Sequence, residues 1–94
     1  MMTVIATLRV KEGQELEFEA LAKEMVKAVN ENEEGCLYYQ AHRTDDPQSY
    51  VFIERYKDEA AAEAHRGSDH YRSIGARMGA HMAGRPDLQI LEQI

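Results

Sequence analysis

The spacing of the apolar residues changes along this chain, and that change constrains the fold more than any other feature of the sequence. Apolar side chains alternate over residues 2–10, the spacing of a strand, and then recur at three- and four-residue steps over residues 14–31, the spacing of an amphipathic helix. A turn at residues 11–13 separates the two segments. The faces expected to be buried carry Val4, Ala6, Leu8 and Val10 on the strand and Phe18, Leu21, Ala22, Met25 and Val29 on the helix.

Strand spacing returns after this helix. Residues 36–43 and 49–56 alternate again, and the polar turn at residues 44–48 between them predicts a hairpin. Asn30 to Gly35 supplies the polar exit of the helix that precedes it.

Two shorter helices and a final strand complete the chain. Asp58 can cap a helix that ends at Gly67, and Ser68 or Asp69 can cap a second helix that runs to a break at residues 84–86. The second helix is predicted to bury one stripe of side chains, which are Tyr71, Ile74, Met78 and Met82. In the last strand, alternate positions carry Leu88, Ile90, Glu92 and Ile94.

The resulting β-α-β-β-α-α-β order predicts one domain, residues 1–94, in the α+β class: a ferredoxin-like split β-α-β sandwich whose antiparallel sheet has helices on one face. The other face then needs a cover. If several large apolar side chains share it, a second copy of the chain is the economical cover, so we expect a homodimer. The candidate side chains are Ile5, Tyr38, Tyr50, Phe52 and Tyr56.

The charge balance disfavours nucleic acid as a partner. Seventeen acidic against eleven basic residues give a net charge of −6, the wrong sign for phosphate contacts. Alternating aromatic residues on a ferredoxin-like strand, as at Tyr50, Phe52 and Tyr56, also occur in RNA-binding platforms. Those platforms carry a basic, glycine-bearing motif there, and residues 49–56 lack one.

Cysteine content and hydropathy bear on location. The single Cys36 can form neither an internal disulfide nor a cysteine-rich metal site, which fits a reducing compartment. The first residues lack a basic leader pattern, and no apolar run approaches the ~20 residues of a membrane span. We therefore expect a cytoplasmic protein with no membrane association.

The stretch EEGCLYYQAHRTDDPQSYVFIERYKDEAAAEAHRGSDHYR, residues 33–72, resembles the signature region of the antibiotic biosynthesis monooxygenase (ABM) family. The opening TVIATLRVKEGQ resembles the same family, particularly its quinol monooxygenase branch. The resemblance implies a dimeric α/β barrel with a pocket between sheet and helices in each subunit. It also implies oxygenation by molecular oxygen, without a cofactor, of a small aromatic or enolic substrate such as a quinol, a phenol or a polycyclic aromatic compound.

Departures from other branches of the family narrow this expectation. The haem-degrading branch uses an Asn, a Trp and a His where this chain aligns Ala6, His65 and Gly75, and the chain contains no Trp. A branch that isomerises a small phosphorylated signalling sugar is the alternative, because its motif resembles residues 57–71 almost as well. A non-enzymatic dimeric module that only binds a small ligand in the same pocket also stays open.

The candidate catalytic residues are His65 and Tyr71. An imidazole titrates near neutral pH, so His65 can serve as the general base, although it could instead cap a helix C-terminus. Tyr71 can donate its hydroxyl to a substrate oxygen or simply pack in the core. The resemblance and the helix pattern add the following candidates for contact with substrate: Ala6, Glu54, His70, Ile74 and Met78.

Glu54 and the remaining histidines have competing interpretations. A carboxylate among strand aromatics must find a partner or stay protonated, so Glu54 could orient a histidine or pair with Arg9, the reading we favour. His70 is more simply an exposed side chain or part of an interhelix hydrogen bond. The pattern predicts that His42 and His81 are exposed.

The spacing argues against a metal and against a phosphate cradle. His65 and His70 are five residues apart across the break at Gly67, and neither an HExxH nor a cysteine-bearing pattern occurs, so we expect no metal. No glycine-rich loop is present, and Arg66, Arg72 and Arg77 are the only nearby cations.

Overall fold

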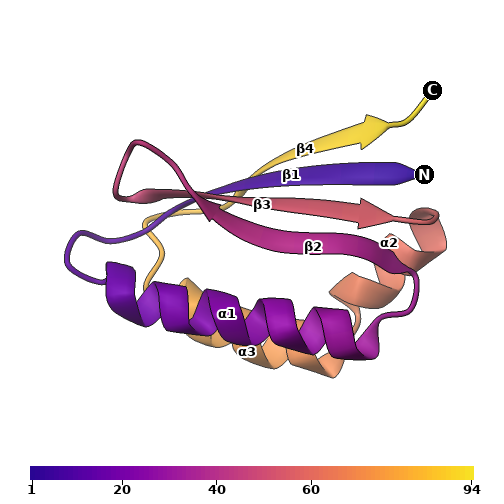
Figure 1. Ribbon diagram of the computed structural model, residues 1–94. Coiled ribbons are helices and arrows are strands. Elements are labelled where there is room, and N and C mark those ends of the chain that lie inside the picture. The colour runs from indigo at the N-terminus through magenta and orange to yellow at the C-terminus, as the bar shows by residue number, and fades with distance from the viewer.

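The computed structural model describes all residues from 1 to 94, and it contains one sheet with three helices on one of its faces (Figure 1). The four strands are ordered β2-β3-β1-β4, and every neighbouring pair is antiparallel. This arrangement confirms the α+β ferredoxin-like fold. In chain order the elements are β1 (Met2–Arg9), α1 (Glu15–Asn32), β2 (Cys36–Arg43), β3 (Ser49–Tyr56), α2 (Glu59–Arg66), α3 (Asp69–Gly79) and β4 (Asp87–Glu92).

The periodicities locate most elements well. Both hairpin strands have the predicted bounds, and α1 begins and ends one residue later than expected. Gly13 forms the turn before α1 with a φ of +85°, a conformation that glycine adopts without steric cost. None of the three helices combines the length and the apolarity needed to cross a bilayer.

The core forms between the helices and the inner face of β1 and β3. In the pairing of these strands Ala6 lies opposite Phe52 and Leu8 lies opposite Tyr50, so small side chains on β1 face large ones on β3. The ring of Tyr50 also packs on Phe18 of α1, with ring centroids 5.0 Å apart. All nine side chains predicted to be buried, eight on β1 and α1 and Val10 directly after β1, are buried.

The aromatic residues of β3 correct one expectation. Tyr50, Phe52 and Tyr56 are only 4%, 2% and 1% exposed, because they face the helices and form part of the core. Alternation along β3 predicted that they share a face, but it could not say which face the helices would cover. The outer face of the sheet instead carries Ile5 and the exposed Tyr38.

The short helices begin where the cap signals predicted. The Asp58 carboxylate accepts a hydrogen bond from the backbone N–H of Ala61 at 2.8 Å, and the Ser68 hydroxyl accepts one from the N–H of Tyr71 at 3.2 Å. Ser68, rather than Asp69, is therefore the cap of α3.

The C-terminal end of α3 differs from the prediction. The helix ends at Gly79 instead of reaching the break at residues 84–86, and Met82 is not part of its stripe. Met82 pairs with Val10 in an isolated antiparallel bridge, because the chain turns back here to extend the edge of β1.

The helices leave β4 uncovered. Leu88 and Ile90 lie opposite Ala6 and Val4 in the pairing with β1, so they share the inner face of the sheet. They are nevertheless 60% and 61% exposed, since no helix packs over them. An apolar pocket opens in this gap beside β1.

Substitution of Gly35 tests how closely α2 packs on the connection between α1 and β2. A Cβ at this position would lie 2.7 Å from the Cβ of Ala61, which is too close unless α2 shifts. Gly35→Ala is expected to destabilise the protein by about 1–3 kcal/mol, the usual cost of overpacking, and to lower its melting temperature.

The matched control is Gly79→Ala, because a Cβ there meets nothing within 4 Å. The control is expected to keep or slightly raise the melting temperature, since alanine favours a helix over glycine by roughly 1 kcal/mol. Equal melting temperatures for the two variants would contradict the close packing of α2 at Gly35.

Candidate functional site

A pocket of about 150 Å³ lies between the sheet and the helices, beneath β1 and β4. Twelve of its 17 lining residues are hydrophobic, which suits an apolar ligand. The lining consists of Val4, Ala6, Leu8, Met25, Tyr39, Phe52, Glu54, Tyr56, His65, Arg66, Tyr71, Gly75, Met78, Met82, Pro86, Leu88 and Ile90.

Most of the residues proposed from the sequence meet in this pocket. Ala6, Glu54, His65, Tyr71 and Met78 line it, although they come from four different elements. The other two proposed contacts are not part of the lining. Ile74 is buried in the hydrophobic core, and His70 lies on the far side of His65 in a hydrogen-bond network described below.

Glu54 brings a carboxyl group into the apolar lining. It is 8% exposed and accepts a hydrogen bond of 2.6 Å from the Tyr56 hydroxyl. Burial raises the pKa of this carboxyl to about 7, although the hydrogen bond from Tyr56 opposes the shift. Glu54 can therefore exchange a proton with a ligand near neutral pH.

The expected pairing of Glu54 with Arg9 is wrong. Arg9 forms an ion pair with Asp46 at 2.9 Å, on the exposed side of the molecule. The reason is strand geometry: Glu54 lies opposite Val4 on the inner face, whereas Arg9 is five residues further along β1 and therefore on the outer face.

His65 occupies the last turn of α2 and is only 3% exposed. Its ring packs among the rings of Tyr39, Tyr56 and Tyr71, with centroid distances of 5.2, 5.6 and 4.6 Å. Burial lowers the pKa of the His65 imidazole, and the carboxylate of Glu33 opposes this shift. The neutral ring is thus the form that the site favours.

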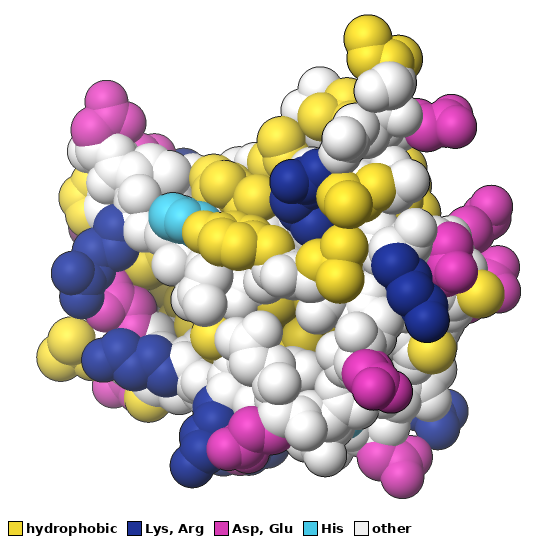
Figure 2. Space-filling view, turned by 45° about the vertical axis from the view of Figure 1, so that its right-hand side comes forward, with side chains coloured by type: hydrophobic (Ala, Val, Ile, Leu, Met, Phe, Trp, Pro, Cys, Tyr) yellow, Lys and Arg dark blue, Asp and Glu magenta, His cyan; other side chains and the backbone are white.

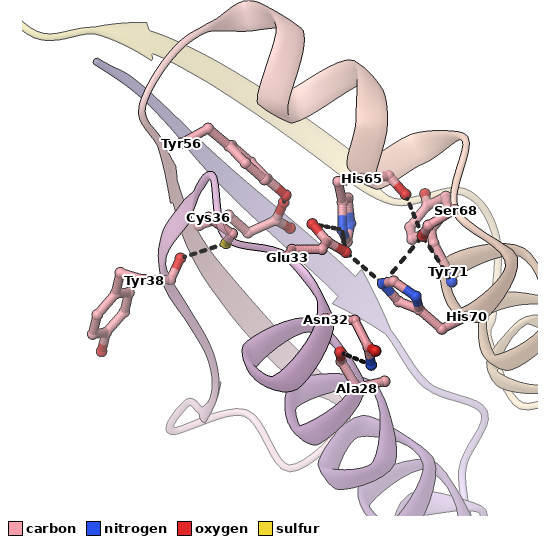
Figure 3. Close-up of polar contacts among 11 residues, drawn as sticks. Ala28, Asn32, Glu33, Cys36, Tyr38, Tyr56, His65, Ser68, His70 and Tyr71 are labelled. Carbon is pink, nitrogen blue, oxygen red and sulfur yellow. Dashed lines mark hydrogen bonds and ion pairs between the residues drawn. The ribbon is translucent and has the colours of Figure 1, made fainter.

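Glu33 is the residue of the site that the sequence did not reveal. It follows α1 directly, and its carboxylate lies between His65 and His70 (Figure 3). The distances are 2.8 Å from Oε2 to His65 Nδ1 and 2.5 Å from Oε2 to His70 Nε2. The segment EEGC was visible as a family-like motif and as a helix exit, but nothing local indicated a contact with residues more than thirty positions away.

The contact with Glu33 determines which nitrogen of His65 is free. Because a carboxylate only accepts, Nδ1 of His65 carries the proton and donates it, so Nε2 keeps its lone pair. Nε2 has no hydrogen-bond partner in the chain. Every fully buried polar side-chain atom does have a partner, so Nε2 is not fully buried. Nε2 is therefore open to the pocket that His65 lines.

Ser68 connects the two histidines at the break between α2 and α3. Its hydroxyl donates to the backbone oxygen of His65 at 2.7 Å and lies 3.1 Å from Nε2 of His70. His70 thus takes part in the predicted interhelix hydrogen bonding. Glu33, His65 and His70 also form the one group of side chains whose ligand atoms could hold a metal ion, all within 4.8 Å of one another.

Tyr71 stands at the rim of the pocket rather than in the core. It is 36% exposed, unlike Ile74 and Met78 on the same helix, so the predicted stripe is less deeply buried at its first residue. The Tyr71 hydroxyl forms no hydrogen bond within the chain, which leaves it available to a ligand.

The two other histidines are less exposed than predicted. Both are half-buried, because each ring nitrogen Nδ1 has a partner: His42 contacts the backbone oxygen of Val51 at 3.2 Å, and His81 contacts Oε1 of Gln14 at 2.8 Å. Neither lines the pocket.

Comparison with known proteins points to one family. The family model described as "Antibiotic biosynthesis monooxygenase" (ABM) matches residues 1–77. Among curated proteins, "Putative monooxygenase Rv0793" of Mycobacterium tuberculosis is 38% identical over 47 residues. That match spans 50% of this chain and 46% of the relative, so the chain covers less than half of that relative's length.

Solved structures extend the similarity over the whole fold. A crystal structure from Caulobacter crescentus CB15, described as a "putative antibiotic biosynthesis monooxygenase", is 35% identical with a TM-score of 0.95, and the superposition covers 99% of this chain and 89% of that one. The structure of Rv0793 from Mycobacterium tuberculosis is 27% identical with a TM-score of 0.90, covering 99% and 94%.

The raised pKa of Glu54 predicts a specific pH dependence of stability. Because the folded state holds this proton more tightly than the unfolded chain, the associated stability is fully present below about pH 4.5 and is lost as the pH rises through about 7. The loss amounts to on the order of 3 kcal/mol. Glu54→Gln keeps an acceptor for Tyr56 but cannot ionise, so it is expected to unfold at a higher temperature than the parent at about pH 8 and not at about pH 4.

Thermal unfolding across this pH range checks the prediction, with Glu31→Gln as the control. Glu31 is exposed on α1 and forms no hydrogen bond, so its substitution removes the same charge without the burial. A Glu54→Gln variant that is less stable than the parent at every pH would contradict the assignment.

Proposed function

Because the chain belongs to the antibiotic biosynthesis monooxygenase family, we propose that it oxygenates a small quinol or phenol in the pocket beneath β1 and β4. Molecular oxygen is the co-substrate, and the reaction needs no bound cofactor. The observation that carries the proposal is the pairing of an apolar pocket with the free Nε2 of His65, whose other nitrogen is held by Glu33.

The proposed chemistry uses electrons from the substrate itself. Nε2 of His65 removes the phenolic proton, and the resulting phenolate is electron-rich enough to react with oxygen. For a phenol that becomes a quinone, one oxygen atom forms the new carbonyl group and the other leaves as water with two hydrogens from the substrate. The four electrons that reduce the oxygen molecule come from the ring.

Two pocket groups support this assignment of roles. The Tyr71 hydroxyl at the rim can donate to a substrate oxygen as negative charge develops on it. Glu54, with a pKa of about 7, can return a proton to the departing oxygen. A ligand bound against the apolar walls would displace water from the pocket, which strengthens both interactions.

The size and polarity of the pocket favour an aromatic substrate over a phosphorylated sugar. A volume of about 150 Å³ matches a cavity that accepts a single benzene ring, so a larger substrate would extend over the exposed Leu88 and Ile90. Arg66 is the only Lys or Arg in the lining, whereas a phosphate group calls for several donors. Isomerisation of a phosphosugar is therefore the less favoured alternative.

The assay that tests this function is oxygen uptake with a panel of one-ring and two-ring quinols and naphthols. His65→Gln is expected to lower turnover by about 10²–10⁴-fold, the usual contribution of a general base. Circular dichroism and the melting temperature establish that the variant is folded.

Tyr71→Phe provides a second variant that keeps the ring and its packing on His65. It is expected to lose turnover by at most about 10²–10³-fold at unchanged stability, as for one missing hydrogen-bond donor. Binding of the whole panel without oxygen uptake would indicate a ligand-binding module rather than an enzyme. Isomerisation of a phosphosugar without oxygen uptake would indicate an isomerase.

A homodimer joined through the outer faces of two sheets forms part of the proposal. Figure 2 shows apolar side chains gathered on the upper, sheet side of the molecule. On the outer face, Tyr38 and Leu91 are each 41% exposed, and Ile5, Val51 and Ile53 are half-buried without any element above them. Exposed apolar surface of this kind is typical of an interface.

Sedimentation at micromolar concentration is expected to give about twice the mass of the chain, the size of a closed two-fold assembly. Ile53→Glu places a charge at the centre of the outer face, between β1 and β2, and is expected to shift the protein to monomer. A monomeric parent protein would exclude this arrangement.

A further inference from the structure

We propose that Glu33, His65 and His70 form a site for a divalent transition metal such as Zn²⁺, and that occupation of this site switches off the base in the adjacent pocket. The inhibitory part rests on the proposed function, whereas the metal site itself does not. Neither the pocket chemistry nor the family comparison assigns this role to the three residues.

Three elements that are distant in sequence bring the donor atoms together. Glu33 follows α1, His65 lies in the last turn of α2 and His70 lies in the first turn of α3. Their ligand atoms all lie within 4.8 Å of one another. The side chains are 10%, 4% and 20% exposed, so the donors are largely withdrawn from water. The greater exposure of His70 provides the side from which an ion can enter.

The donor set determines the kind of ion. Two imidazole nitrogens and one carboxylate oxygen suit Zn²⁺ and Co²⁺, whereas Mg²⁺ and Ca²⁺ prefer oxygen ligands alone. Zinc sites with three protein ligands leave the fourth position to water, and the Ser68 hydroxyl, 3.1 Å from Nε2 of His70, can hydrogen-bond such a water.

Shifts of the donor atoms by about 1.5 Å or less would admit an ion. The carboxylate oxygen of Glu33 lies 2.8 Å from His65 Nδ1 and 2.5 Å from His70 Nε2, where N–H groups now donate. Metal–ligand bonds of about 2.0–2.2 Å in a tetrahedron separate the donors by roughly 3.3 Å. The ion would thus take the place of the two N–H protons, and each neutral ring would keep one proton, now on its other nitrogen. The donor nitrogens would move away from the oxygen by less than about 1 Å and toward each other by up to about 1.5 Å.

Metal binding has a consequence for the pocket. When Nδ1 of His65 binds the ion, the neutral ring carries its proton on Nε2, the nitrogen that is open to the pocket. Nε2 then donates a hydrogen bond and can no longer accept a substrate proton. The metal form would bind a phenol without activating it.

Titration of the protein with Co²⁺ and Zn²⁺ tests the site without any reference to activity. One equivalent of Co²⁺ is expected to bind and to produce visible absorption bands of a nitrogen- and oxygen-ligated ion, and Mg²⁺ is expected not to compete. His70→Gln is expected to weaken binding by at least about tenfold. His42→Gln is the control, because His42 lies on the outer face of the sheet, away from the three donors.

Nuclear magnetic resonance of the histidine rings tests the metal site in the unaltered protein, without any substitution. Zn²⁺ should shift the ring signals of His65 and His70 and spare those of His42 and His81. Shifts confined to His42 or His81, no binding at millimolar metal, or equal affinity in His70→Gln would each overturn the site.

Oxygen uptake then tests the inhibitory role separately. One equivalent of Zn²⁺ is expected to abolish turnover, and a chelator to restore it. Tight binding at the three residues with full turnover would overturn the switch. If the metal-free protein shows no turnover, the proposed function fails, and the binding experiments still decide the metal site.

Discussion

The antiparallel pairing of β1 with β3 determines which side chains can meet beneath the helices. It brings Val4 opposite Glu54 and Ala6 opposite Phe52, so the short side chains of β1 lie beside the long ones of β3. The space above the short side chains is the pocket. A shift of this pairing by one residue would turn Glu54 to the outer face and remove both the carboxyl group and the hollow that contains it.

Burial then gives the polar groups of the site their chemistry. The loss of water outweighs both the hydrogen bond from Tyr56 and the charge of nearby Arg66, so Glu54 holds its proton up to about neutral pH. His65 loses water too, but Glu33 accepts from one ring nitrogen and thereby leaves the other free. One carboxylate at the end of α1 thus sets the orientation of a ring on α2 and at the same time ties down His70 on α3. The contacts of Glu33 that orient His65 therefore also fix the break between α2 and α3.

Local patterns predicted what depends on local geometry. Alternation located β2 and β3 at their observed bounds, and the caps Asp58 and Ser68 marked where helices begin, because strand pleat and helix capping act within a few residues. The family-like segments led to His65 and Tyr71, which both line the pocket. The order of the elements was sufficient for the fold class.

The main errors of prediction concern contacts between segments that are distant in the sequence. Alternation grouped Tyr50, Phe52 and Tyr56 on one face, but only the packing of α1 makes that face the inner one. Glu33 contacts residues 32 and 37 positions away, and no periodicity reports such a contact. The early end of α3 follows from backbone pairing of Met82 with Val10, a tertiary contact that outweighs the helical pattern of the sequence.

Most residues that line a pocket also pack in the core. On the uncovered inner face of β4 these two roles are separate. Leu88 and Ile90 form part of the wall, yet their exposure means that they contribute little to the core. Substitutions there can reshape the mouth of the pocket at small cost in folding free energy, whereas a change at Ala6 or Phe52 would disturb the packing of the sheet. The last strand can therefore change which ligands fit the pocket while Glu54, His65 and the fold stay as they are.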